Sequence, residues 1–148
     1  MNILPSLWLP KNRSFVHRIA LDDTDNRTSP GTGHLTRAIA SILAGRIPLL
    51  GVTRHQLLDD PRVPMTAKNS ANVIHLQIDS SPGNSFDLSP LADEVAGLMR
   101  ARFQPGSDPG LCLAIDPPPA IVKFGRRTQT ELVTAGEAAH LARSHNLI

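Results

Sequence analysis

Three carboxylates fall within four residues of the sequence, at Asp22, Asp23 and Asp25. Like charges this close repel one another unless a cation or hydrogen bonds offset the repulsion. Magnesium prefers oxygen ligands, and it usually binds through one or two carboxylates together with water and substrate phosphates. The spacing is compatible with a magnesium–phosphate site in which all three are metal ligands and Asp22 and Asp23 also act in catalysis. Aspartates are common turn formers and helix caps too, and the spacing leaves that alternative open.

Small residues follow the acidic run, in the segment Ser29-Pro-Gly-Thr-Gly33. Such residues let backbone N–H groups approach phosphate oxygens, and the N-terminus of a following helix favours negative charge. We therefore expect Gly31, Thr32 and Gly33 to bind the phosphates of a cofactor. The run is not a Walker A sequence, because it has no Gly-Lys-Ser/Thr, and it lacks the third glycine of GxGxxG.

A second polar segment, residues 59–70, offers one cation and several hydrogen-bond donors. We expect Lys68 to meet a phosphate and Asn69 to contact ribose or base, with Ser70 completing the cofactor-binding set. A solvated surface loop explains the same composition equally well. His34 opens the next predicted helix beside the acidic loop and is a candidate general base or phosphate contact. A histidine at a helix start is, however, more often incidental.

Alternating strands and helices must position these residues. The hydrophobic pattern predicts strands at 15–21, 49–53, 73–78 and 111–115, and helices at 34–44, 89–103, around 124–127 and at 134–145. Ser89 is expected to be the N-cap of the second helix, and residues 134–137 form a capping box for the last. The order predicts a single layered α/β domain with a mixed sheet of about four strands and three or four helices. Residues 1–13 are interpreted as an N-terminal extension.

Composition narrows the class of protein. The chain has 148 residues, 41% hydrophobic and 19% charged, which is typical of a globular domain. A net charge of +2 without a basic stripe, together with one Trp, four Phe and no Tyr, argues against a dedicated nucleic-acid binder. The first ten residues lack the basic region of a signal peptide, and no apolar run approaches the roughly 20 residues of a membrane span. We therefore expect a cytoplasmic protein with no membrane partner.

Residues 19–25 (IALDDTD), followed by a Gly-Thr-Gly turn and a helix, resemble the N-terminal portion of the archaeal tRNA-isoleucine agmatidine synthetases. That family opens with an I-x-x-D-D-T-D strand and loop. Residues 58–70 and 122–147 resemble two later family segments, in the same order. The resemblance implies that residues 14–148 are a kinase-like domain that uses ATP and Mg²⁺ for phosphoryl or nucleotidyl-type transfer. It also implies that Asp22, Asp23 and Asp25 handle magnesium and the ATP phosphates.

The sequence also departs from the family. The family's turn ends in Gly-Met-Cys-Thr-Thr, whereas this chain reads Gly31-Thr-Gly-His-Leu-Thr36. The threonine linked to phosphate transfer is thus replaced by His34 or displaced to Thr36, and both are catalytic candidates. The family's later loop and tRNA-binding domains do not follow, so we expect a domain truncated at its C-terminus that does not bind tRNA alone.

The leading interpretation is an ATP- and Mg²⁺-binding domain that acts on a small molecule or with a protein partner. Two alternatives stay open at this point. One is a non-catalytic module that binds a phosphorylated metabolite or a protein. The other is an incomplete remnant of such an enzyme.

Overall fold

The computed structural model describes residues 13–80 and 87–148. In chain order the elements are β1 (Arg13–Asp22), α1 (Thr32–Ala44), β2 (Leu49–Gln56), β3 (Ser70–Ser80), α2 (Ser89–Arg100), β4 (Gly110–Ile115), α3 (Pro119–Arg127) and α4 (Ala135–Ser144). The α/β class, the four strands and the layered single domain are confirmed. The extension predicted for residues 1–13 lies outside the described residues, apart from Arg13 at the start of β1. No helix in the described ranges has the length and apolar character needed to cross a membrane.

The four strands form one sheet in the order β2-β3-β1-β4, and each neighbouring pair is antiparallel. The expectation of a mixed sheet was therefore wrong. The reason is that α1 joins β1 to β2 and α2 joins β3 to β4, and in each case a third strand lies between the two strands joined. A β-α-β-β-α-β order of this kind is the ferredoxin-like arrangement.

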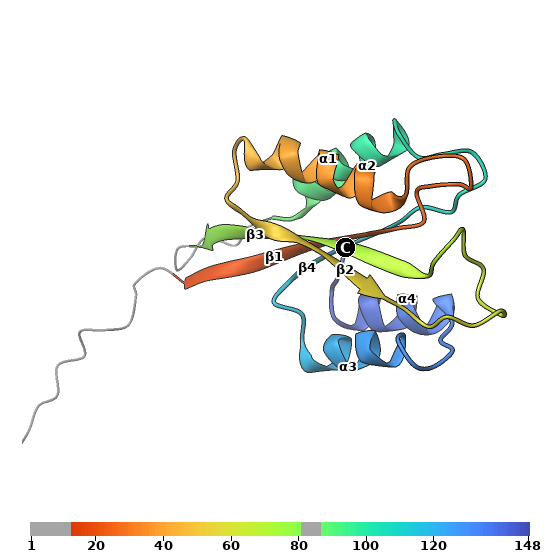
Figure 1. Cartoon of the computed structure of the whole chain (residues 1–148). Helices are drawn as coiled ribbons and strands as arrows, with labels where there is room; N and C mark the ends of the chain where they lie inside the picture. The colour runs from red at the N-terminus through yellow and green to blue at the C-terminus, as the bar shows by residue number, and fades with distance from the viewer. Residues whose placement is uncertain (1–12, 81–86) are drawn as a thin grey trace, which may run out of the picture.

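The main core lies between the sheet and the helices α1 and α2, which cover the same face (Figure 1). Ile19 in the central strand β1 pairs in register with Ile74 of β3 and Leu113 of β4. All three side chains are fully buried. The buried cluster consists of Ile19, Leu21, Ile39, Ala40, Leu43, Ile74, Leu76, Leu91, Ala92, Val95, Met99 and Leu113.

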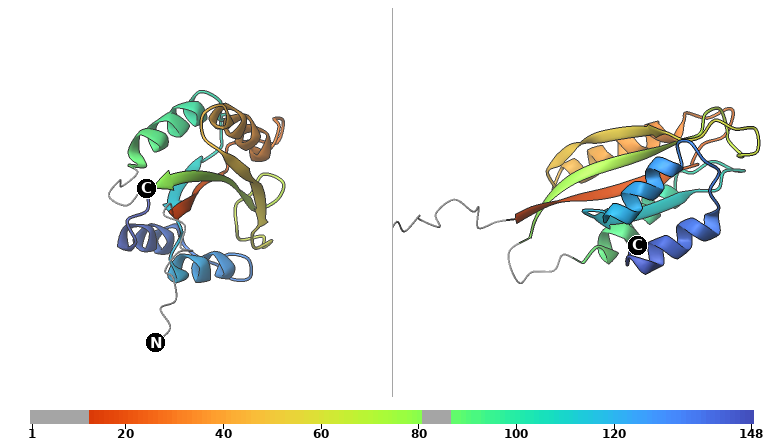
Figure 2. Two further views of the ribbon diagram at one scale, coloured as in Figure 1. Left: turned by 90° about the vertical axis from the view of Figure 1, so that its left-hand side faces the viewer. Right: turned by 90° about the horizontal axis from the view of Figure 1, so that it is seen from below.

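The helices α3 and α4 lie on the opposite face of the sheet (Figures 1 and 2). Side chains alternate between the two faces of a strand, so this face carries Arg18, Ala20 and His75, which are small or polar. Neither helix contains a buried residue. This layer is therefore packed with much less apolar burial than the layer formed by α1 and α2.

The observed N-caps of the helices agree in part with those predicted from the sequence. Thr134 caps α4 as predicted, because its side-chain oxygen accepts a hydrogen bond from the backbone N–H of Glu137 at 3.1 Å. Ser89 is the first residue of α2 and not its N-cap, which is Leu88. The backbone N–H of Ser89 donates instead to Oδ1 of Asp87 at 2.9 Å, so an aspartate two residues earlier takes the capping role.

Substitutions of two isoleucines on α1 can test which face of this helix packs in the core. Ile39 is fully buried, whereas Ile42, one turn later, is 42% exposed. We expect Ile39→Ala to lower the free energy of unfolding by about 2–5 kcal/mol, because the substitution leaves a cavity in the core. The matched change Ile42→Ala should alter it by about 0.5 kcal/mol or less. Urea denaturation followed by circular dichroism measures both, and equal losses would contradict this packing.

Candidate functional site

One large pocket of about 880 Å³ lies where β1 and β2 end and β3 begins. The acidic loop with the first turns of α1, the strand ends, the loop between β2 and β3, and the connection between α3 and α4 line it, and Asp108 between α2 and β4 lines it too. The residues foreseen from the sequence that line this pocket are Asp22, Asp23, Asp25, Gly31, Thr32, Gly33, His34, Lys68, Asn69 and Ser70. The fold therefore joins the two polar segments of the sequence into one site.

Thr36 is the candidate that the structure does not bring into the pocket. Its side chain is fully buried, and its hydroxyl donates to the backbone oxygen of Thr32 at 2.9 Å. The helical repeat places it on the core side of α1, while His34 is exposed at the pocket wall. His34 and Thr36 were the two candidates for a catalytic group in this turn. The pocket contains His34 and not Thr36.

Thr32 connects the acidic loop to α1. Its Oγ1 accepts hydrogen bonds from the backbone N–H of Thr24 at 3.0 Å and from the hydroxyl of Thr24 at 3.1 Å. The Thr32 hydroxyl itself donates to Oδ1 of Asp25 at 2.9 Å. Thr24 and Thr32 are both buried, so water competes little for these bonds. They hold the Asp25 carboxylate beside the N-terminus of α1, where the helix dipole favours negative charge.

Asp22 and Asp23 are each fixed by one hydrogen bond from the backbone. The N–H of Asp23 donates to Oδ1 of Asp22 at 2.8 Å, and the N–H of Asp108 donates to Oδ2 of Asp23 at 3.0 Å. Asp23 has a φ of 44°, a left-handed conformation that aspartate tolerates better than most residues. Among the described residues, the second oxygen of each carboxylate, Asp25 included, makes no hydrogen bond.

The charge of Asp22 is poorly stabilised by the protein alone. Burial raises the pKa of this carboxyl, and the negative charges of Asp23 and Asp25 add to the rise, whereas the hydrogen bond from the Asp23 N–H opposes it. In the part of the chain that the structure describes, no three His, Cys, Asp or Glu side chains form a metal site by themselves. A magnesium ion bound here would therefore need water and ligand oxygens to complete its coordination sphere, as magnesium ions in proteins usually do.

Cationic side chains line the same pocket. They are Lys68, which the sequence indicated, and Arg37 and Arg54, which it did not. Across residues 13–80 and 87–148 none of the three forms an ion pair, although Nε of Arg54 donates to Oγ of Ser70 at 3.0 Å. Guanidinium groups left without a carboxylate partner suit an anionic ligand. Arg37 could have been predicted from the sequence, because it follows Gly33 by one helical turn and therefore lies on the same side of α1.

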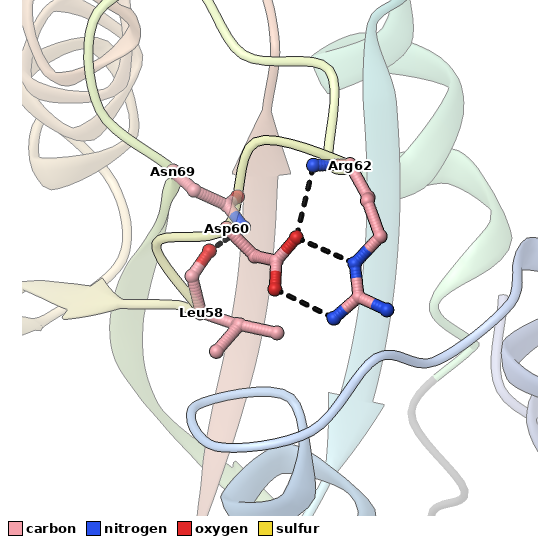
Figure 3. Close-up of polar contacts among 4 residues, drawn as sticks. All are labelled: Leu58, Asp60, Arg62 and Asn69. Carbon is pink, nitrogen blue, oxygen red and sulfur yellow. Dashed lines mark hydrogen bonds and ion pairs between the residues drawn. The ribbon is translucent and has the colours of Figure 1, made fainter.

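The loop between β2 and β3, residues 57–69, is ordered by its own side chains (Figure 3). The Nδ2 of Asn69 donates to the backbone oxygen of Leu58 at 2.8 Å. Arg62 donates through Nε and Nη2 to the two carboxylate oxygens of Asp60, both at 2.8 Å, and lowers the pKa of Asp60 to about 2. The amide nitrogen of Asn69 is therefore engaged in shaping the loop, and the predicted contact with ribose or base would fall to its remaining groups.

Apolar side chains also line the pocket, and we call them the apolar wall. Its members come from the β2–β3 loop and from the α3–α4 connection: Leu57, Leu58, Val63, Met65, Leu132 and Val133. The backbone N–H of Leu58 donates to the oxygen of Thr128 at 2.9 Å, which joins these two segments. The pocket thus combines charged and apolar lining side chains.

Two solved structures share this fold. The crystal structure of TiaS in complex with an isoleucine tRNA and ATP matches with a TM-score of 0.71 at 16% identity, covering 90% of this chain and 32% of that one. The crystal structure of a tRNA fluorescent labeling enzyme matches with a TM-score of 0.70 at 16% identity, covering 90% and 31%. No protein-family model and no curated protein matches the sequence.

TiaS is a tRNA-isoleucine agmatidine synthetase, the family that the sequence resembles. The resemblance is therefore confirmed at the level of the fold, which is what a likeness at 16% identity establishes. This chain spans about a third of the length of either neighbour.

The substitution Asp22→Asn tests the electrostatics of the acidic loop. Asparagine keeps an acceptor for the Asp23 N–H and removes a charge that burial disfavours. Because the pKa of Asp22 is raised in the folded state, we expect the variant to unfold at a higher temperature near neutral pH, without nucleotide or divalent cation. The gain should disappear below pH 3.8, where the carboxyl is protonated in both the folded and the unfolded states.

The matched control is Asp60→Asn. Arg62 lowers the pKa of Asp60, so this substitution removes a favourable interaction and should not raise the melting temperature near neutral pH. Scanning calorimetry at about pH 7 and about pH 3 compares the two variants. An equal gain from both would contradict a local origin at Asp22.

Proposed function

We propose that this chain is an ATP- and Mg²⁺-binding, kinase-like domain that activates a substrate by phosphoryl or nucleotidyl-type transfer. The observation that carries the proposal is the composition of the pocket. It combines the three carboxylates of the acidic loop, the Gly-Thr-Gly start of α1 and three cations without carboxylate partners in the described residues. Asp108 and Glu131 line the pocket as well. The crystal structure of the fold neighbour TiaS was obtained with an isoleucine tRNA and ATP, which supports a nucleotide as the ligand.

In this proposal the acidic loop is the metal-binding side. Asp22, Asp23 and Asp25 each have an oxygen that the described hydrogen bonds leave free. A bound magnesium ion would neutralise phosphate charge and offset the repulsion among the carboxylates. The backbone of Gly31 and Gly33 then approaches the phosphate oxygens, in a place where larger side chains would fill the space.

The remaining walls bind the rest of the nucleotide and the acceptor. The apolar wall accommodates the base, because Leu58, Met65 and Leu132 offer aliphatic contact and no aromatic residue lines the described pocket. Lys68 approaches the phosphates from the β2–β3 loop. His34 is exposed at the pocket wall, where it would accept a proton from the attacking group of the acceptor.

A second candidate is a non-catalytic module that binds a phosphorylated metabolite. Two observations favour it. Thr36 lies outside the pocket, and each carboxylate of the acidic loop already accepts one hydrogen bond, from Asp23, Thr32 or Asp108. This candidate predicts binding that does not depend on magnesium and is not followed by turnover. The two candidates therefore differ in a measurable way.

Titration calorimetry with ATP, in the presence and absence of magnesium, tests the proposal. We expect the affinity to rise with magnesium and to fall about tenfold or more in the double variant Asp22→Ala/Asp23→Ala, because the metal loses its ligands. The control is Asp93→Ala, an exposed acidic residue of α2 outside the pocket. If the double variant binds ATP as well as the control does, the assignment of the acidic loop is wrong.

A further inference from the structure

Asn72 in β3 is a buried polar side chain that lines the pocket. The residue is 5% exposed, and no hydrogen bond joins its amide to another residue of 13–80 and 87–148. Its amide atoms are not among the fully enclosed unpaired ones, so they reach the pocket. The large majority of side-chain polar atoms removed from bulk water in proteins are hydrogen-bonded, because leaving an amide unpaired there is unfavourable. An amide left open toward a cavity therefore points to a ligand that pairs with it.

The sheet register places this amide next to the first turn of α1. Asn72 pairs with Leu21 on one side and with Arg54 on the other. A Cβ atom at Gly33 would lie 3.3 Å from Oδ1 of Asn72 and 3.5 Å from Nη1 of Arg37. The Gly33 backbone, the Asn72 amide and the Arg37 guanidinium therefore surround one small volume. Glycine at position 33 keeps that volume open.

Each group around this volume carries a hydrogen-bond donor to an anion: the Gly33 N–H, the Arg37 guanidinium and Nδ2 of Asn72. A half-turn of the Asn72 amide exchanges Nδ2 with the acceptor Oδ1 that faces Gly33. The N-terminus of α1, a helix of 13 residues, presents free N–H groups and a partial positive charge. Arg37 contributes a guanidinium without an ion-pair partner among the described residues. No carboxylate belongs to the three groups that define the volume. An anionic oxygen group, and not a cation, is the chemical complement.

We propose that Asn72, Arg37 and the backbone of Gly33 form an anion subsite that takes a phosphoryl group. The inference rests on the proposed function in that it concerns the same pocket, but its residues are separate from the metal-binding loop. The phosphoryl group belongs either to ATP or to a phosphorylated second substrate. In either case the group that meets Asn72 is a phosphoryl oxygen.

The substitution Asn72→Leu separates a ligand-binding role from a structural one. Leucine has nearly the same shape and removes the unpaired amide, so the ligand-free variant should melt at the same or a higher temperature. Its affinity for inorganic pyrophosphate should fall about tenfold or more, because a hydrogen bond to a charged group is lost. If the amide were structural, the variant would melt lower and would bind pyrophosphate as the wild type does.

Arg37→Gln is the second variant, and Arg46→Gln is its matched control. Arg46 follows α1, lies outside the pocket and is paired with Glu94. We expect Arg37→Gln to weaken pyrophosphate binding and Arg46→Gln to leave it unchanged. Titration calorimetry of the full chain with pyrophosphate and, separately, with ATP measures all three proteins. Competition between the two ligands then identifies the source of the phosphoryl group.

The outcomes for this inference and for the proposed function are distinguishable. If ATP binds and neither Asn72→Leu nor Arg37→Gln weakens the binding of ATP or pyrophosphate, the subsite is wrong and the proposed function stands. If pyrophosphate binds through Asn72 and Arg37 but ATP does not bind, the subsite is supported and the proposed function is overturned. Absence of binding by either ligand overturns both.

Discussion

One buried hydroxyl, that of Thr32, ties the end of the central strand to the start of α1. It accepts two hydrogen bonds from Thr24 and donates one to Asp25. The strand β1 is paired on both sides and α1 is anchored in the core, so neither partner of this connection is free to move. The acidic loop between them is therefore held in one shape. The charged wall of the pocket depends on that constraint.

The charges of the pocket are arranged differently from those of the surface. Outside the pocket, Arg18 pairs with Asp116, and Arg46 pairs with Glu94. Inside it, Arg37, Arg54 and Lys68 share a cavity with carboxylates and form no ion pair in the described part of the chain. Keeping opposite charges apart lowers stability, and proteins retain such arrangements chiefly at functional sites. A ligand that carries both a metal ion and phosphates would satisfy the two sets together.

The local features of the site could be predicted from the sequence, because they depend on residues close together in the chain. The strand before Asp22 and the glycines at positions 31 and 33 are examples. Outside the pocket, the capping residue Thr134 is another. Lys68 was a candidate phosphate contact because of the composition of its polar segment, and it lines the same pocket as the acidic loop.

Features that depend on register and topology could not be predicted in the same way. Asn72 enters the pocket because β3 pairs with β1 and β2 in one particular register. Leu132 and Val133 reach it because α3 and α4 fold back across the far face of the sheet. Thr36 was misplaced because a position one turn beyond Thr32 already faces the core.

The most direct test of the account is the electron density of a crystal soaked with magnesium and a non-hydrolysable ATP analogue. The account predicts density for the phosphates at the Gly31–Gly33 turn, with an ion between them and the carboxylates of the acidic loop. Density elsewhere, or an acidic loop that keeps its local hydrogen bonds beside an empty pocket at saturating analogue, would contradict it.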